Sequence, residues 1–292
     1  MLTAETSVIA LLYLLLTWLL WRFVERAQPP GGAAMTLAPP PEVAVGPGLR
    51  LAEIAVVIGH CYVLFGVMLA DHQLAFNFAA AISFMVLVGC AAQLVNQLFL
   101  PVNLFGVVLF PLGFVASALV LLFPPPVLKL EATYTPLLGT HFLLAMLAYG
   151  VLCVSAIYAC GIFALDRLLH ARPASPWQRH PVIGPLLRLA PPLLLLERVL
   201  FGTILVGFGL LTASIATGVG FHEQMFGRPF RLDHKFVFSV LSWLVFAVLL
   251  LGRWRFGWRG RVAMRQVFVG FGLLFLGYIG SNFVVEVLLH RG

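Results

Sequence analysis

The sequence predicts an all-α fold: a polytopic transmembrane helical bundle of about eight spans, with the N-terminus and C-terminus outside. Of its 292 residues, 61% are hydrophobic and only 10% are charged, whereas soluble domains carry about 25% charged residues. The mean hydropathy of +1.02 argues against a soluble globular domain. The apolar residues form solid blocks, which is atypical of the alternating strands of a membrane β-barrel and of a disordered chain.

The number of spans follows from the length of the apolar blocks. A hydrocarbon core about 30 Å thick needs about 20 apolar residues in a helix. Eight blocks meet this requirement, at residues 3–21, 51–70, 74–95, 102–123, 138–165, 194–219, 235–252 and 266–289. We therefore expect one integral membrane domain over residues 1–292, with no soluble domain and no convincing repeat of its two halves.

The basic residues predict the orientation of the spans. The loops after the odd-numbered spans carry 13 of the 18 Lys and Arg residues. Because cytoplasmic loops are enriched in Lys and Arg, these loops are expected to be cytoplasmic. The most basic segment, residues 252–261, is expected to anchor the chain there and to attract anionic lipid head groups. It is too short, and too closely flanked by spans, to indicate nucleic acid as a partner.

His60 is the most informative single residue. It lies about ten residues into the second predicted span, and is therefore about 15 Å deep, near the middle of the membrane. An ionisable group at this depth indicates a functional site, such as metal or haem ligation or a proton relay. The alternative is a neutral imidazole that forms hydrogen bonds between helices.

His141 and His234 open the fifth and seventh predicted spans, and the predicted orientation places both at the outer surface. Neutral imidazole is a common ligand of iron, and a low-spin haem takes one axial ligand on each face. Two histidines at one membrane level on different helices would suit such a site. The loop before His234 contains Arg228 and Arg231 among aromatic residues, a composition that suits haem propionates and equally an ordinary interfacial belt.

Other catalytic and metal-binding motifs are absent from the sequence. The four cysteines form no CxxC or CxxCH motif, so zinc binding and covalent haem attachment lack their usual signature. We find no HExxH, GxSxG or P-loop motif and no carboxylate pair within the spans. No catalytic residue is therefore predicted. Glu197 lies at the inner end of the sixth span, where it could pair with another charge.

Three stretches resemble the cytochrome c assembly protein family, the CcsA/CcmC-type haem-handling membrane proteins. Residues 141–150 are similar to the start of the family's shared region. Residues 234–246 and 257–261, with 278–281 after them, are similar to its YpjD-like branch. The resemblance covers residues 51–289 and includes the eight-span layout.

The resemblance implies a multi-pass protein of the bacterial inner membrane that presents haem, with haem b as the expected form, to apocytochrome c or to other cytochrome c biogenesis proteins. By position, His141 and His234 correspond to the two external haem ligands, and His60 resembles a histidine embedded in the membrane. Haem-handling members carry a tryptophan-rich signature between the external histidines, whereas residues 221–234 contain no Trp.

Two other functions stay open from the sequence. The missing tryptophans favour a non-catalytic membrane scaffold or accessory subunit that has lost haem handling. A transporter of protons or small solutes through His60 is the third interpretation. It lacks support from intramembrane carboxylates and from an inverted repeat.

Overall fold

The computed structural model describes residues 2–26, 46–68, 77–99, 105–125, 136–170, 180, 183–188, 190–221 and 234–277. The regular elements in these ranges are all helical, which confirms the predicted all-α class. They are α1 (Leu2–Arg26), α2 (Pro47–Met68), α3 (Phe78–Asn96), α4 (Gly106–Leu122), α5 (Pro136–Leu169), α7 (Ile183–Arg188), α8 (Leu193–Gly220), α10 (His234–Phe256) and α11 (Gly260–Phe275).

Each predicted span overlaps one long helix. Six of these helices are long and apolar enough to cross a membrane, and α4 is an apolar helix of 17 residues. The helix that contains the start of the eighth predicted span, α11, begins six residues before residue 266, at Gly260. Hydropathy marks where apolar residues begin, whereas a helix begins where its first N–H groups find acceptors. The predicted residues 278–289 of this span lie outside the described ranges.

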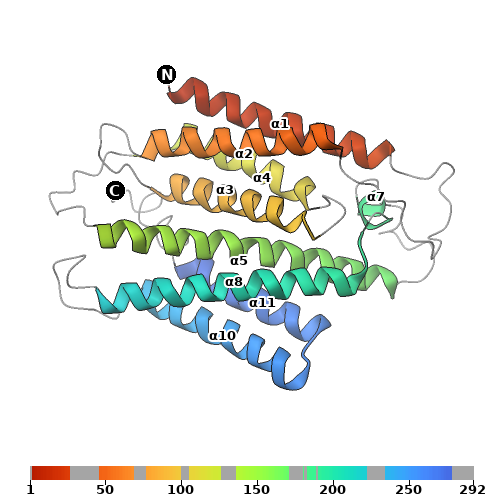
Figure 1. Ribbon diagram of the computed structural model, residues 1–292, viewed down its shortest axis with the longest axis vertical. Coiled ribbons are helices and arrows are strands. Elements are labelled where there is room, and N and C mark those ends of the chain that lie inside the picture. Colours follow the sequence, from red (N-terminus) through yellow and green to blue (C-terminus); the bar gives the residue numbers. More distant parts are fainter. Residues whose placement is uncertain are drawn as a thin grey trace.

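Contacts between the helices close them into two rings of four, α1 to α4 and α5, α8, α10 and α11. The two groups lie side by side (Figure 1). In the first ring α1 packs against α2 and α4, and α3 closes the ring by contacting both of these helices. In the second ring α5 packs against α8 and α11, and α10 closes it in the same way. The two rings meet where α3 packs against α5. Both halves therefore share one packing order, although their sequences gave no convincing repeat, because different side chains support the same arrangement.

Small residues allow the closest helix contacts. A Cβ atom at Gly150 of α5 would lie 2.5 Å from the Cβ of Val88 and 2.9 Å from the carbonyl oxygen of Met85, both on α3. A Cβ atom at Gly113 of α4 would lie 2.7 Å from the ring of Tyr13 on α1. Such contacts are typical of membrane helices, because packing between them cannot rely on the hydrophobic effect.

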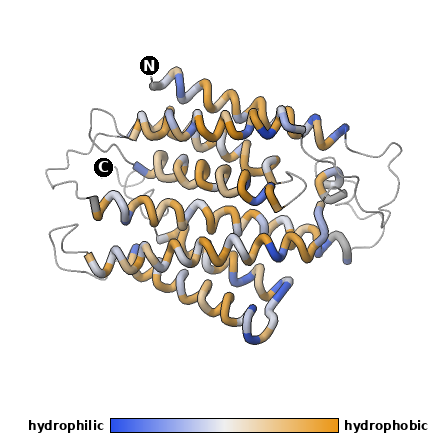
Figure 2. Tube along the Cα trace, in the orientation of Figure 1, coloured by the Kyte–Doolittle hydropathy of each residue, from blue (hydrophilic) through white to orange (hydrophobic). Residues whose placement is uncertain are grey.

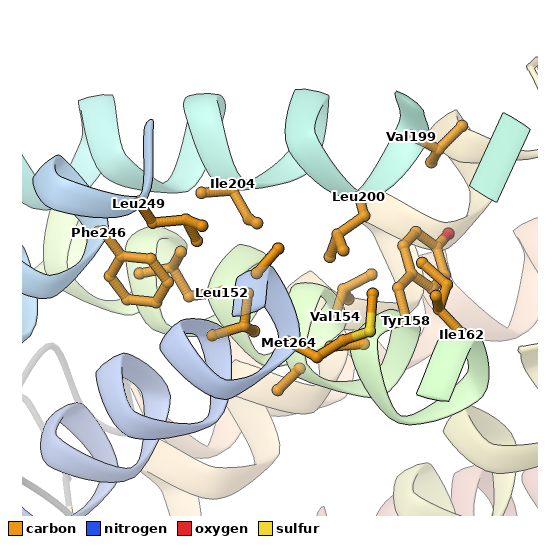
Figure 3. Close-up of a cluster of buried hydrophobic side chains, with 14 of the residues drawn as sticks. Leu152, Val154, Tyr158, Ile162, Val199, Leu200, Ile204, Phe246, Leu249 and Met264 are labelled. Atoms are coloured by element: carbon orange, nitrogen blue, oxygen red, sulfur yellow. The ribbon is translucent and has the colours of Figure 1, made fainter. Parts of the chain in front are cut away.

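The second ring has an apolar core along its axis (Figure 3). Side chains of four helices fill it, namely Leu152, Val154, Tyr158 and Ile162 of α5, Val199, Leu200 and Ile204 of α8, Phe246 and Leu249 of α10, and Met264 of α11. Large apolar side chains also cover the outside of the bundle, for example Leu205 and Leu241. This is expected when the surrounding solvent is lipid.

The charges separate the two ends of the bundle. The end of the bundle where α1 ends and α8 begins is called the inner end. The opposite end, where α5 begins and α8 ends, is called the outer end. Among the described residues, every Lys and Arg except Lys235 belongs to the inner end, where hydrophilic segments are visible at the end of α1 and at the α10–α11 turn (Figure 2). This separation agrees with the predicted orientation, in which the inner end is cytoplasmic.

Candidate functional site

His141 lies in the first turns of α5 and is held by the last turn of α8. Its Nδ1 lies 3.1 Å from the Oγ1 of Thr217. The Thr217 hydroxyl donates to the backbone carbonyls of Ala213 and Ser214, both at 2.9 Å. We infer that the single proton of the hydroxyl stays with these carbonyls and that the oxygen accepts the hydrogen bond from Nδ1–H of His141. The neutral ring then carries its lone pair on Nε2, the tautomer suited to metal ligation.

Gly218 makes room for the His141 ring. A Cβ atom at this position would lie 3.0 Å from Cε1 of His141 and 3.8 Å from Nε2. The sequence Thr217-Gly218 thus supplies a hydrogen-bond acceptor and a flat surface beside it. The ring is half-buried against this part of α8.

His234 is the first residue of α10 and is exposed. Its height in the bundle follows from the antiparallel packing of α8 and α10, in which the indole Nε1–H of Trp243 donates to Oγ1 of Thr212 at 2.8 Å. Counting nine residues back along α10 and nine forward along α8 places His234 level with Phe221. His141 is level with Thr217, which is four residues, or about 6 Å, from that height.

The structure therefore brings two of the predicted site residues to the same end of the molecule, on the two helices that flank α8. Arg228 and Arg231, the predicted propionate ligands, lie outside the described residues. Within the described ranges, no group of three or more His, Cys, Asp or Glu side chains could hold a metal ion. Axial binding of haem iron needs only two such ligands.

His60 lies elsewhere, in the first ring, and is 3% exposed. The Tyr13 hydroxyl of α1 lies 2.8 Å from its Nδ1, and the Ser83 hydroxyl of α3 lies 2.9 Å from its Nε2. Both ring nitrogens thus form hydrogen bonds to neighbouring helices, as in the alternative interpretation from the sequence. Metal ligation by His60, which stays a prediction, would require one of these bonds to break.

A small cavity adjoins this histidine. It has a volume of about 10 Å³ and is lined by His60, Ser83, Ser117 and Thr6 among apolar side chains. This is the space of about one water molecule and is far below the size of a porphyrin.

A second buried polar cluster joins the two rings and was not predicted from the sequence. The Tyr158 hydroxyl of α5 donates to Oε1 of Gln93, and the Asn96 amide donates to this hydroxyl at 2.9 Å. One turn away the Gln97 amide donates to the carboxylate of Glu53 at 2.9 Å, and Glu53 is fully buried. The sequence signal for this cluster was the presence of three amide side chains, Gln93, Asn96 and Gln97, near the end of the third apolar block.

The fold and the outer-end histidines together define a class: a polytopic helical membrane protein that carries two imidazoles, on separate helices, at one end of the bundle. The match to a family model is consistent with this class. Residues 49–289 match the model described as cytochrome C assembly protein. The chain belongs to this family.

Individual relatives match parts of the chain. It is 33% identical over 149 residues, 51% of its length and 52% of the relative's, to an uncharacterized 28.8 kDa protein of Azospirillum brasilense. It is 31% identical over 159 residues, 54% of its length and 55% of the relative's, to the inner membrane protein YpjD of Escherichia coli strain K12. It is 26% identical over 220 residues, 65% of its length and 69% of the relative's, to the cytochrome c biogenesis protein CcsA of Thermosynechococcus vestitus.

The matched stretch therefore spans about half the length of the first two of these relatives. No solved structure matches the chain.

Proposed function

We propose that this protein is a haem-binding and haem-handling protein of the bacterial inner membrane that takes part in cytochrome c assembly. It holds haem b at the outer end of the bundle between His141 and His234 and presents it to apocytochrome c or to other biogenesis proteins. The observation that carries this proposal is the common placement of the two histidines at one end, beside α8, within about one helical turn of the same height.

The residues present fit haem as cargo. His141 is set by Thr217 in the tautomer with its lone pair on Nε2, and His234 is exposed at the end of its helix. Two neutral imidazoles are a known axial ligand pair for low-spin haem iron. Arg228 and Arg231 are proposed to pair with the anionic propionates. The protein's task is ligation and presentation, and the iron chemistry belongs to the haem.

His60 has a secondary part in this proposal. Tyr13 and Ser83 occupy both of its ring nitrogens. It would bind a cofactor only after one of these hydroxyls moved away. We therefore assign the outer histidines as the main ligands.

The test is the absorbance spectrum of protein purified from haem-replete cells. We expect a Soret band from b-type haem that is reduced in His141→Ala and in His234→Ala. His170→Ala, which changes an exposed histidine at the inner end, is the control and should keep the wild-type band. Purified wild-type protein without a Soret band would refute the proposal.

One observation favours a second function, that of a membrane scaffold or accessory subunit. Residues 221–234 contain no Trp, whereas haem-handling members of the cytochrome c assembly family have a tryptophan-rich signature at this position. Purification of the protein with a stoichiometric partner and without any cofactor would support this function and contradict the first.

A further inference from the structure

The turn between α10 and α11 exposes both arginines and aromatic rings at the inner end. Trp254 is 82% exposed and Phe256 is 72% exposed. The neighbouring Arg255 and the later Arg265 are exposed as well. Among the residues that the structure describes, neither of these two arginines has a hydrogen bond or an ion pair.

Several contacts fix the shape of this turn. Gly257 and Gly260 adopt φ angles of +66° and +57°, which residues with a Cβ atom rarely adopt. The Trp258 ring packs on Gly252, where a Cβ atom would lie 2.3 Å from the ring. The Trp258 N–H donates to the Gly252 carbonyl at 3.2 Å, and Arg253 donates to the Trp258 carbonyl at 3.4 Å.

Carboxylates of two other helices neutralise only part of the charge. Glu197 of α8 accepts from Nε of Arg259 at 3.0 Å and from the Gly260 N–H at 3.2 Å. Asp166 of α5 accepts from Nε of Arg261 at 3.3 Å. Residues 253–265 contain five arginines and no acidic residue. Three arginines of the segment thus have no carboxylate partner among the described residues.

We propose that this turn is a binding site for the phosphate head group of an anionic phospholipid in the cytoplasmic leaflet. Guanidinium groups bind phosphate oxygens through paired hydrogen bonds. Arg255, in the last turn of α10, and Arg265, in the second turn of α11, are exposed guanidinium groups on either side of the turn. Exposed Trp rings, such as that of Trp254, are typical of the level of lipid head groups. The turn's own hydrogen bonds hold it in shape, so little conformational entropy is lost when a lipid binds.

Charge and surface chemistry distinguish this site from general attraction of the inner end to the membrane. Arg22 and Arg26 also lie at the inner end, at the end of α1. Arg22 is paired with Glu25 at 3.6 Å and lies over the Trp18 ring, so of these two only Arg26 has no carboxylate partner among the described residues. The α10–α11 turn combines unpaired guanidinium groups with a rigid backbone. If lipid binds at a specific site, removing two charges beside the α10–α11 turn should weaken binding more than removing two charges at the end of α1. If diffuse positive charge attracts the lipid, the two changes should weaken binding equally.

The experiment is lipid titration of the purified full-length protein, followed by native mass spectrometry, with phosphatidylglycerol and phosphatidylcholine as probes. We expect the wild type to retain phosphatidylglycerol preferentially. The double variant R255Q/R265Q should bind it about thirtyfold more weakly, because a neutral amide forms a weaker hydrogen bond to a phosphate oxygen than a guanidinium group does. The control R22Q/R26Q removes the same charge at the same end and should bind almost as the wild type does.

Three results would overturn the proposal. Equal losses in both double variants would show diffuse attraction, and equal retention of the two lipids would show no head-group preference. Displacement by inorganic phosphate at the same concentration would show a site for a free anion. A circular dichroism melt checks that each variant folds. The Soret band, whose proposed ligands lie at the opposite end, is expected to be unchanged in R255Q/R265Q, so the outcome is independent of the haem proposal.

Discussion

The hydroxyl of Thr217 provides the sharpest test of how the outer end would hold haem. Thr217→Val keeps the shape of the side chain but removes the oxygen that lies 3.1 Å from Nδ1 of His141. Without this acceptor, no hydrogen bond to Thr217 favours the proton on Nδ1 of His141, so the tautomer with the proton on Nε2 becomes more populated. Only the tautomer with the proton on Nδ1 offers Nε2 to iron, so we expect weaker haem binding in this variant.

The expected loss of haem affinity in Thr217→Val is based on metal sites in which a hydrogen bond orients the ligating histidine. Changing the partner that orients a ligating histidine lowers metal affinity by about 10-fold to 100-fold, which corresponds to about 1.4–2.8 kcal/mol of binding free energy. The Thr217 bond belongs at the lower end of this range, because the histidine is half-buried and water can replace part of the lost acceptor. We expect the haem dissociation constant to rise about tenfold.

The assay is a Soret titration of haem-depleted protein in detergent. Thr212→Val is the matched control, because Thr212 lies on the same helix and also donates to its own backbone, but its side-chain oxygen accepts from Trp243. Thr217→Ser, which keeps the hydroxyl, should bind haem almost as the wild type does. If His141→Ala lowers haem affinity and Thr217→Val leaves it unchanged, the inferred role of the threonine is wrong.

Further predictions concern the stability of the bundle and can be checked by thermal melting in detergent. Gly150→Ala should lower the free energy of unfolding by about 1–3 kcal/mol, because its methyl group would meet the neighbouring helix α3 at 2.5 Å. Gly202→Ala is the control: a methyl group there has nothing within 4 Å and should be neutral or stabilising by up to about 1 kcal/mol. Equal effects of the two substitutions would contradict the close contact between the rings. His60→Leu should lower it by about 1–3 kcal/mol, because two buried hydroxyls lose their partner, and an unchanged melting temperature would show that these bonds contribute nothing. Glu197→Gln should lower it by about 1 kcal/mol, because the amide still accepts from the first N–H of α11 but loses the ion pair with a half-exposed arginine.

The sequence located the spans because hydropathy is a local property that accumulates along each helix. The block predicted at residues 235–252 corresponds to α10, which covers His234–Phe256. The largest difference between a predicted and an observed start is at α11, which begins six residues before the predicted block. At the start of α11, a carboxylate from α8 accepts from the first N–H group.

The candidate site was predictable in part. The depth of His60 followed from counting residues, and the common end of His141 and His234 followed from the alternation of spans and the placement of arginines. The partners of these histidines were not predictable. Tyr13, Ser83 and Thr217 are ordinary polar residues in apolar helices, and nothing local distinguishes them from residues that face lipid.

By itself, the sequence determined that this protein is a helical membrane protein, where its helices lie along the chain, and which end carries the arginines. Only the tertiary structure decided that the helices form two rings, that α8 lies between the helices of the two outer histidines, and that a fully buried Glu53 bonds to Gln97. The physical reason is that crossing a membrane requires only length and apolar character, whereas contact between side chains depends on which helices are neighbours and on how each is rotated. Helices that are apolar on nearly every face leave both of these open.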